Sequence, residues 1–455
     1  MTGALLLCAV FSALAEPSVA PDRQLAEIER RDSGDLFLSG VDGLRDGIDS
    51  VGGEFVVGHE LIYMGRLGDE LENRLGRGQE AFVEGQGWSR LWGRGDWLSL
   101  YVSPNLEFGV NCDSDKICSQ ADLREWFVGV ERGGFRVGLG AEERSLGPHE
   151  RGSLVIGRDA KPWNALSGRW RGEGEYGMFK VEGSLGLLLG ERNDIQTPMV
   201  MHMDIRYSPV SWYEVGLSRL SLLGGEGRPL PSIWEILVPL NPHVDGDPDQ
   251  LEPDTDELAA IDMRFTIPIG FAGVQWLEVW SQYGGEDMIM RSIGPLPVPA
   301  LGGVGNLFGG SLRVPYGVVS LERTVLMDDT FRWYEGHRIY HDGFVVDGRT
   351  IGHLHGGDAE STWLSLKSDT SPFGAEAWLE SLRRVDVVDV VGDNLLTTMA
   401  DERSWSAGVR GWRLSDDDGY LSVGASIGRV TAEDNVVGAD RFTGRVWFEW
   451  SQGVN

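Results

Sequence analysis

Aromatic and ionisable residues gather between residues 331 and 358 of this 455-residue sequence. Binding of a sugar chain needs aromatic faces for C–H surfaces and planar polar groups for hydroxyls, and this stretch supplies both. It therefore predicts a polysaccharide-binding surface. The candidate contacts are Trp333, Tyr334, His337, Tyr340, His353 and Asp358.

The same stretch holds four of the eight histidines of the chain, so other interpretations stay open. The spacings His337-x-x-x-His341 and His353-x-His355 match no defined zinc motif, and no metal is expected. The structural alternative is a loop that His and Tyr side chains hold in place by hydrogen bonds.

A second candidate lies in the sequence from Trp276 to Trp280. Alternate positions of a strand share one face, so Glu278 lies between the indoles of Trp276 and Trp280. This arrangement also suits sugar contact. The alternative is an aromatic girdle at a membrane interface, with a carboxylate on the inner face.

Strands must position these residues, because a two-residue alternation of apolar and polar positions recurs along the chain. It is clear in His202–Tyr207 and in Asp262–Ile267. Unpaired charges in a dry core cost several kcal/mol, whereas a wet barrel lumen accepts them. The predicted lumen-lining residues are Asp204, Arg206, Asp262 and Arg264. A soluble sandwich with its polar face in water alternates identically and stays an alternative.

The positions of aromatic residues, the alternation of tight turns with long loops, and a last strand at the C-terminus favour a membrane barrel. Aromatic residues expected in interfacial girdles lie near strand ends at Tyr207, Trp276, Tyr283, Phe448 and Trp450. Tight turns at 131–134 and 416–419 contrast with long polar loops such as 241–257. No stretch beyond the N-terminal residues reaches the roughly 18 apolar residues of a membrane helix. At roughly 10 residues per strand, residues 53–455 predict an all-β fold, a large antiparallel transmembrane barrel of 16 to 18 strands.

The N-terminal residues resemble a secretory signal peptide. An apolar run from Ala4 to Ala15 ends in a small-x-small site, so residues 1–15 are predicted to be a signal peptide. Residues 16–52 do not alternate and are expected to form a short, partly helical periplasmic segment. Once Cys8 leaves with the signal, Cys112 and Cys118 remain and are predicted to form a loop disulfide.

Composition excludes several classes of function. A formal net charge of −30 disfavours a nucleic-acid partner, which needs clustered Lys and Arg. The acidic run 245–257 lacks the order of an EF-hand loop and is expected to be a solvated loop. No Gly-x-Ser-x-Gly occurs, and 70 acidic residues offer too many pairs to assign a glycosidase site. No cofactor is expected.

Four groups of segments, in order along residues 120 to 370, resemble the Wzi family of capsule-assembly proteins. One combines Val215–Arg219 with Gly224–Leu230, and another combines Leu258–Phe265 with Gly284–Asp287. A third combines Leu146–Pro148, Gly152–Leu154 and Ala160–Pro162, and the fourth runs from Trp333 to Asp358. The resemblance implies an outer-membrane barrel of about eighteen strands that tethers exported capsular polysaccharide as a surface lectin. Members also carry an N-terminal helical bundle, for which residues 16–52 are too short.

The resulting hypothesis is a non-enzymatic, monomeric outer-membrane barrel whose partners are a capsular or other surface polysaccharide and membrane lipid. A diffusion porin of the same fold is the first alternative, in which the lumen charges set ion selectivity. A barrel enzyme that acts on lipid or glycan is the second.

Overall fold

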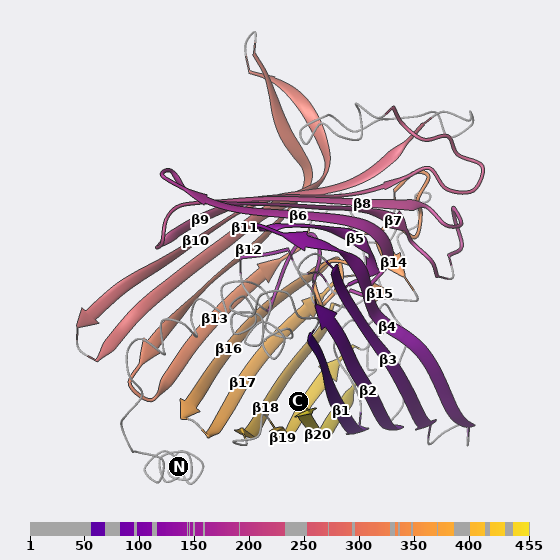
Figure 1. The fold of residues 1–455 in the computed structure, drawn as a ribbon. Helices are drawn as coiled ribbons and strands as arrows, with labels where there is room; N and C mark the ends of the chain where they lie inside the picture. Colours follow the sequence, from indigo (N-terminus) through magenta and orange to yellow (C-terminus); the bar gives the residue numbers. More distant parts are fainter. Residues whose placement is uncertain are drawn as a thin grey trace.

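The computed structural model shows 18 antiparallel strands that close into one barrel (Figure 1). Each strand pairs with the next along the chain, β13 pairs with β16, and β20 returns to β1. The small hairpin β14–β15 lies outside this sheet. The closed ring confirms the predicted all-β fold and falls within the predicted range of 16 to 18 strands.

The wall strands are β1 (Val56–Gly68), β2 (Phe82–Arg94), β3 (Leu98–Asn111), β4 (Lys116–Arg132), β5 (Phe135–Ala141), β6 (Asn164–Gly174), β7 (Gly177–Leu187), β8 (Met199–Val210), β9 (Tyr213–Leu223), β10 (Thr255–Phe271), β11 (Val274–Ile293), β12 (Leu296–Val314), β13 (Gly317–Val325), β16 (Ala359–Thr370), β17 (Phe373–Arg384), β18 (Glu402–Leu414), β19 (Gly419–Thr431) and β20 (Arg441–Val454). The hairpin consists of β14 (Val345–Val346) and β15 (Arg349–Thr350).

The structure describes residues 56–68, 82–94, 98–111, 116–142, 144, 146–148, 151–157, 160–190, 192–232, 253–271, 273–293, 296–327, 333–334, 337–346, 349–370, 372–385, 401–414, 419–432 and 440–454. The predicted signal peptide and periplasmic segment lie outside these residues. So does Cys112, on which the predicted disulfide depends. Within the described part of the chain, no helix is long and apolar enough to cross a membrane.

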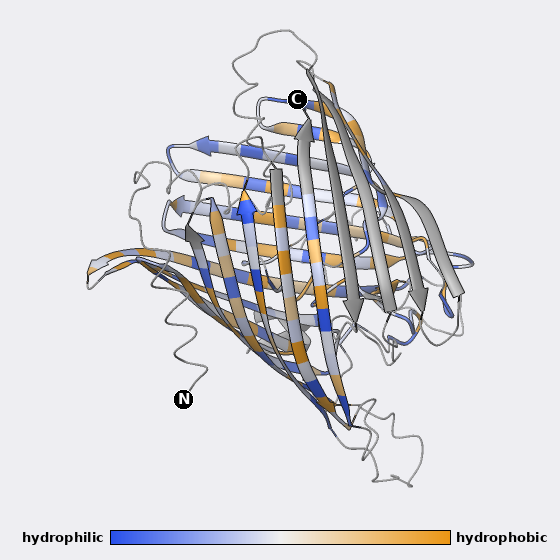
Figure 2. Ribbon diagram, turned by 90° about the horizontal axis from the view of Figure 1, so that it is seen from below, coloured by the Kyte–Doolittle hydropathy of each residue, from blue (hydrophilic) through white to orange (hydrophobic). Residues whose placement is uncertain are grey.

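The outer surface of the wall is apolar and the inner surface is polar. On β10, Ile261 is 41% exposed and Asp262 beside it is 1% exposed, because successive side chains point to opposite faces. Orange and blue positions alternate along the described strands in Figure 2 in the same way. This apolar exterior is the band that meets lipid in outer-membrane barrels.

The predicted aromatic girdle is correct in part. Tyr283, Phe448 and Trp450 are exposed and point outward, as expected for an interface with lipid headgroups. Trp276 is not part of this outer girdle, because it shares the inner face of β11 with Trp280, whose side chain is buried. The girdle alternative for the pair Trp276 and Trp280 is therefore wrong.

The two ends of the barrel differ in their connections. Two-residue turns at 133–134, 175–176, 211–212 and 315–316 join strands at one end, which we call the turn end. Segments 142–163, 188–198, 224–254 and 326–358 connect strands at the other, the loop end. Short turns are periplasmic and long loops extracellular in bacterial barrels, so the loop end faces outward from the cell.

Strands β11 and β12 extend past the rim of the loop end as a two-stranded ribbon (Figure 1). Their pairing continues to Ile293 and Leu296, whereas the neighbouring strands stop pairing at Glu286 and Asn306. The ribbon therefore has two unpaired edges above the barrel.

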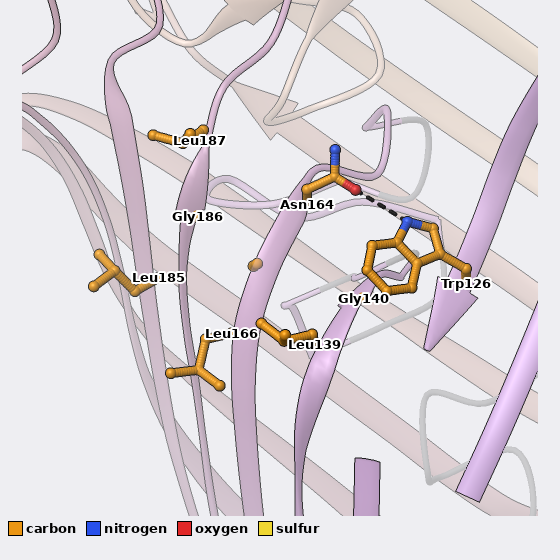
Figure 3. A pocket seen from close by; sticks show the side chains of 9 residues that line it. Trp126, Leu139, Gly140, Asn164, Leu166, Leu185, Gly186 and Leu187 are labelled. Atoms are coloured by element: carbon orange, nitrogen blue, oxygen red, sulfur yellow. Dashed lines mark hydrogen bonds between the residues drawn. The ribbon is translucent and has the colours of Figure 1, made fainter. Parts of the chain in front are cut away.

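The outer wall also carries a shallow groove of about 300 Å³ across β4 to β7 (Figure 3). Leu139, Leu166 and Leu185 line it, and the indole nitrogen of Trp126 donates a hydrogen bond to Asn164 Oδ1 over 3.0 Å at its upper side. Because these leucines belong to the exposed apolar band, the groove faces lipid and is separate from the lumen.

The orientation of the wall can be tested with one charge placed on either face of β19. Val423→Arg puts a cation on the lipid face and is expected to reduce the free energy of unfolding by about 2–4 kcal/mol near the bilayer midplane. Ser426→Arg, on the inner face of the same strand, should cost markedly less. Urea unfolding in lipid vesicles measures both, and equal costs would contradict the assigned orientation.

Candidate binding site at the loop end of the barrel

The described residues of two connections at the loop end fold into the barrel and pack against its inner wall. We call residues 142–163 the first inner segment and residues 326–358 the second inner segment. Their buried apolar side chains form one cluster with inward residues of β9 to β12. The cluster includes Leu146, Leu154, Val155, Ile156, Trp163, Leu220, Leu258, Trp280, Leu307, Trp333, Tyr334, Tyr340, Phe344 and Ile351. Each large side chain removed from water contributes about 1.5–3 kcal/mol to this packing.

Tyr334 joins the two inner segments. Its hydroxyl donates to the carbonyl oxygen of Leu154 over 2.8 Å and accepts the backbone N–H of His353 over 2.9 Å. A Cβ at Gly352 would lie 2.2 Å from the Tyr334 ring, so only glycine allows this close approach. Packing around one tyrosine thus requires glycine at position 352.

Glu380 of β17 ties both inner segments to the wall. Its carboxylate accepts a hydrogen bond from Arg151 of the first segment and lies 2.8 Å from His355 Nε2 of the second. Arg384, four residues further along β17, donates to the carbonyl oxygen of His355 over 3.3 Å. The next histidine, His353, lies 3.2 Å from Thr324 Oγ1 on β13.

Burial sets the protonation of these histidines. It lowers the pKa of His353 well below its usual value, and His355 and Arg151 act in the same direction. Burial also lowers the pKa of His355, although Glu380 opposes the shift. Both imidazoles are therefore neutral at pH 7.

The predicted lumen-lining charges form a network on β8, β9 and β10. Arg206 lies 3.1 Å from Asp204, 3.0 Å from Glu214 and 3.1 Å from Asp262. Arg264 lies 3.7 Å from Glu214. Asp204 and Asp262 are buried, so pairing stabilises them where the sequence had suggested hydration by a wet lumen.

Exposed polar side chains cover the outer side of the second inner segment and the connection between β7 and β8. We call this surface the polar platform. It consists of the exposed residues Asn193, Gln196, Arg338 and His341 and the half-buried Asp342. Its side chains are planar amide, guanidinium, imidazole and carboxylate groups, the types that bind sugar hydroxyls.

A buried ion pair and several hydrogen bonds hold the platform. Arg192 and Asp194 form a fully buried pair over 2.8 Å, and Arg192 also donates to the carbonyl oxygen of Gly343 over 2.9 Å. The Asp194 carboxylate accepts the backbone N–H of Asp342 over 3.0 Å, which joins the two connections. Arg338 reaches Asp254 at the start of β10 over 3.1 Å.

The nine candidate contacts predicted from the sequence divide by burial. Trp280, Trp333, Tyr334, Tyr340 and His353 are buried in the packing of the inner segments. Trp276, Glu278, His337 and Asp358 are partly exposed. Direct sugar contact stays a prediction for all nine. The buried five instead help to hold the inner segments against the wall. Trp280, for example, donates to Glu322 Oε2 over 3.1 Å.

Sequence reasoning missed Arg151, Glu380, Arg192 and Asp194, which hold the site together. Arg192 and Asp194 stand two residues apart between two alternating segments, which is the only local signal. Within the described residues, no group of three or more His, Cys, Asp or Glu side chains is arranged to hold a metal ion.

A closed ring of strands, apolar outside and charged inside, defines this chain as an outer-membrane β-barrel. The chain belongs to the capsule assembly protein Wzi family, whose sequence profile matches residues 77–441. The match confirms the family resemblance found in the sequence. A comparison with curated proteins finds no match.

Solved structures of other outer-membrane proteins have a similar fold. One is that of Wzi from Escherichia coli, described as an outer membrane protein involved in group 1 capsule assembly and a carbohydrate-binding β-barrel. It is 14% identical, with a TM-score of 0.63, over 96% of this chain and 89% of that chain. OprD of Pseudomonas aeruginosa is 11% identical, with a TM-score of 0.51, over 88% and 96% of the two chains. OpdL of the same organism is 10% identical, with a TM-score of 0.51, over 88% and 99%.

The role of Glu380 can be tested by Glu380→Gln. The change removes the charge that holds Arg151 and His355, and a hydrogen bond to a charged group contributes about 1.5–3 kcal/mol. Faster hydrogen exchange, measured by mass spectrometry, is expected in residues 146–157 and 349–358. Glu376→Gln is the matched control, since Glu376 pairs only within the wall with Arg410 among the contacts described. Unchanged exchange in Glu380→Gln would refute the role.

Acid is expected to loosen the inner segments. The pKa values of His353 and His355 are lowered in the folded state, so the packed form disfavours protons that the released form accepts. The stability from these residues is complete above pH about 6.5, the ordinary histidine pKa, and is lost as the pH falls below it. Protection of residues 349–358 from hydrogen exchange, relative to the intrinsic exchange rate at each pH, should therefore decrease as the pH falls from 7.5 to 5. A His353→Gln, His355→Gln double variant should lose most of this dependence, and an unaltered dependence would contradict it.

Proposed function

We propose that this chain binds exported capsular polysaccharide at the loop end of the barrel and holds it at the cell surface without cleaving it. Membership of the capsule assembly protein Wzi family supports this proposal, as does the carbohydrate binding described for the Escherichia coli relative. The observation that carries it is the polar platform, a set of mostly exposed polar side chains of the types that bind sugar hydroxyls, on a packed support at the end that faces outward.

The chemistry of the platform suits a weak, repeated contact. Asn193 donates its backbone N–H to Asp342 over 2.6 Å, so the two connections present their polar groups together. Each sugar unit would gain a few hydrogen bonds, and a long polymer engages many barrels on one cell. Multivalent contact of this kind retains a polymer strongly without a high affinity at each site.

The packing of the inner segments argues against the porin alternative. They bury a continuous apolar cluster against the inner wall at the loop end, where an open porin requires a water-filled path. The likeness to OprD and OpdL concerns the fold. In planar bilayers we expect almost no conductance at pH 7.5, and steady single-channel currents would favour a porin.

An enzymatic role has less support. The sequence has no Gly-x-Ser-x-Gly, and the buried Glu380, His355 and Arg151 form a contact that joins the inner segments to the wall. Release of new reducing ends from capsular polysaccharide, or of free fatty acid from lipid, would reverse this conclusion. A monomer is expected, with lipid around the barrel.

The platform predicts a specific loss of polymer binding. The Arg338→Ala, His341→Ala double variant removes two exposed donors and is expected to weaken binding of host capsular polysaccharide at least about tenfold, or 1.4 kcal/mol. The control is Arg403→Ala, which removes a more exposed arginine beside Asp401 on the other side of the loop end. Binding is measured on protein in vesicles, and capsule on cells is compared with capsule shed. Full capsule retention in the double variant would refute the assigned platform.

A further inference from the structure

Three tryptophans lie along the inner wall formed by β16 to β20, apart from the inner segments. They are Trp378 on β17, Trp412 on β18 and Trp447 on β20, and each is partly exposed. Each shares the face of buried inward residues on its own strand, such as Glu380 on β17 and Ser404 on β18. Their indoles therefore face the lumen and not the lipid.

Each of these tryptophans lies flat over a glycine of the neighbouring strand. Trp378 pairs with Gly408, Trp412 with Gly374 and Trp447 with Gly424. A Cβ at any of the three glycines would come within 2.1 to 2.3 Å of an indole atom, so the rings rest directly on the backbone. A ring that lies flat on the wall turns its other face toward the lumen.

The three pairs form one continuous array. The ring centroids of Trp378 and Trp447 are 5.8 Å apart. Register places Gly424 beside both Trp447 and Arg410, and places Arg410 beside Glu376. Trp378 is two residues from Glu380, which holds the inner segments. The array thus lies on the turn side of those segments.

Cationic groups edge the array. Arg410 and Lys367 lie 5.3 Å and 5.6 Å from the ring of Trp412, and Arg445 lies 5.1 Å from the ring of Trp447. Glu376, 3.0 Å from Arg410 and opposite Lys367 in register, and Glu449, two residues from Trp447 on the same face of β20, are carboxylates beside these cations. Three cations therefore lie close to two of the three indoles on this part of the inner wall.

We propose that this tryptophan array is a second saccharide-binding site, on the lumen side of the inner segments, for a sugar chain that carries carboxylates. Indole faces stack on sugar C–H surfaces, while guanidinium groups bind carboxylates through paired hydrogen bonds. The occupant is a saccharide and not a lipid, because the array faces away from the apolar band. The site is distinct from the polar platform, and saccharide binding at the two sites can be tested separately.

The array can be tested with defined probes on the full-length protein in detergent. Hexagalacturonate is the acidic probe and maltohexaose the neutral one, each titrated by calorimetry at pH 7.5. All proteins carry Arg338→Ala and His341→Ala, which remove the platform contacts. In this background hexagalacturonate is expected to bind, and maltohexaose to bind at least tenfold more weakly.

Trp412→Leu and Trp447→Leu should each weaken hexagalacturonate binding about tenfold, whereas Trp412→Phe, which keeps a ring over Gly374, should retain part of it. The matched control is Trp405→Leu, which removes an outward tryptophan from the same strand and should bind as the background does. Circular dichroism checks that each variant folds. Absence of hexagalacturonate binding in the background, equal binding of both probes, or equal affinities of the Trp412 and Trp405 variants would overturn the proposal. Loss of capsule retention in the platform variant alone bears only on the proposed function.

Discussion

A charge can lie on the packed part of this inner wall only where an opposite charge meets it. Arg206 shows the constraint most clearly, because carboxylates from three adjacent strands surround it. Two of them, Asp204 and Asp262, are buried. Removal of one partner from such a network leaves a buried charge and costs several kcal/mol. The inner segments can fill this side of the barrel because the wall beneath them is already neutralised.

The same constraint explains why Glu380 holds both inner segments in place. Glu380 lies 229 residues from Arg151 in the sequence. It neutralises that arginine in the packed interior of the barrel. Through His355 it also holds the second inner segment. One carboxylate on a rigid strand therefore fixes the positions of two long connections, which in turn support the exposed platform.

Alternation along the strands predicted the two faces of the wall, whereas loop lengths, aromatic positions and the family resemblance favoured a barrel over a sandwich that alternates identically. Ile261, Asp262 and Met263 alternate as a strand between lipid and lumen must, and chain length then limits the number of strands. The stretch from 331 to 358 was found by composition, but composition does not separate an exposed imidazole from a buried one. His341 is exposed and His353 is buried, and the difference depends on Tyr334 and Thr324, which are close only after folding.

The partners of the site could not be predicted for a related reason. Arg151 and Glu380 are ordinary members of a sequence with 40 basic and 70 acidic residues, and their pairing arises from the closure of the ring. Trp276 shows the opposite error: its place near a strand end suggested the girdle, whereas the parity of β11 puts it inside. Parity relative to a known inward residue decides the face, and that reference is available only once one residue of the strand is placed.

Rigidity of the support matters for the proposed contact with a polymer. Each sugar unit gives little free energy, and any that is spent on ordering side chains is lost from binding. The buried pair of Arg192 and Asp194 and the hydrogen bond from Tyr340 to the carbonyl oxygen of Gly224 order the backbone beneath the platform before a ligand arrives. A weak site can then act repeatedly along a repeating chain, and retention follows from the number of contacts and not from the strength of any one.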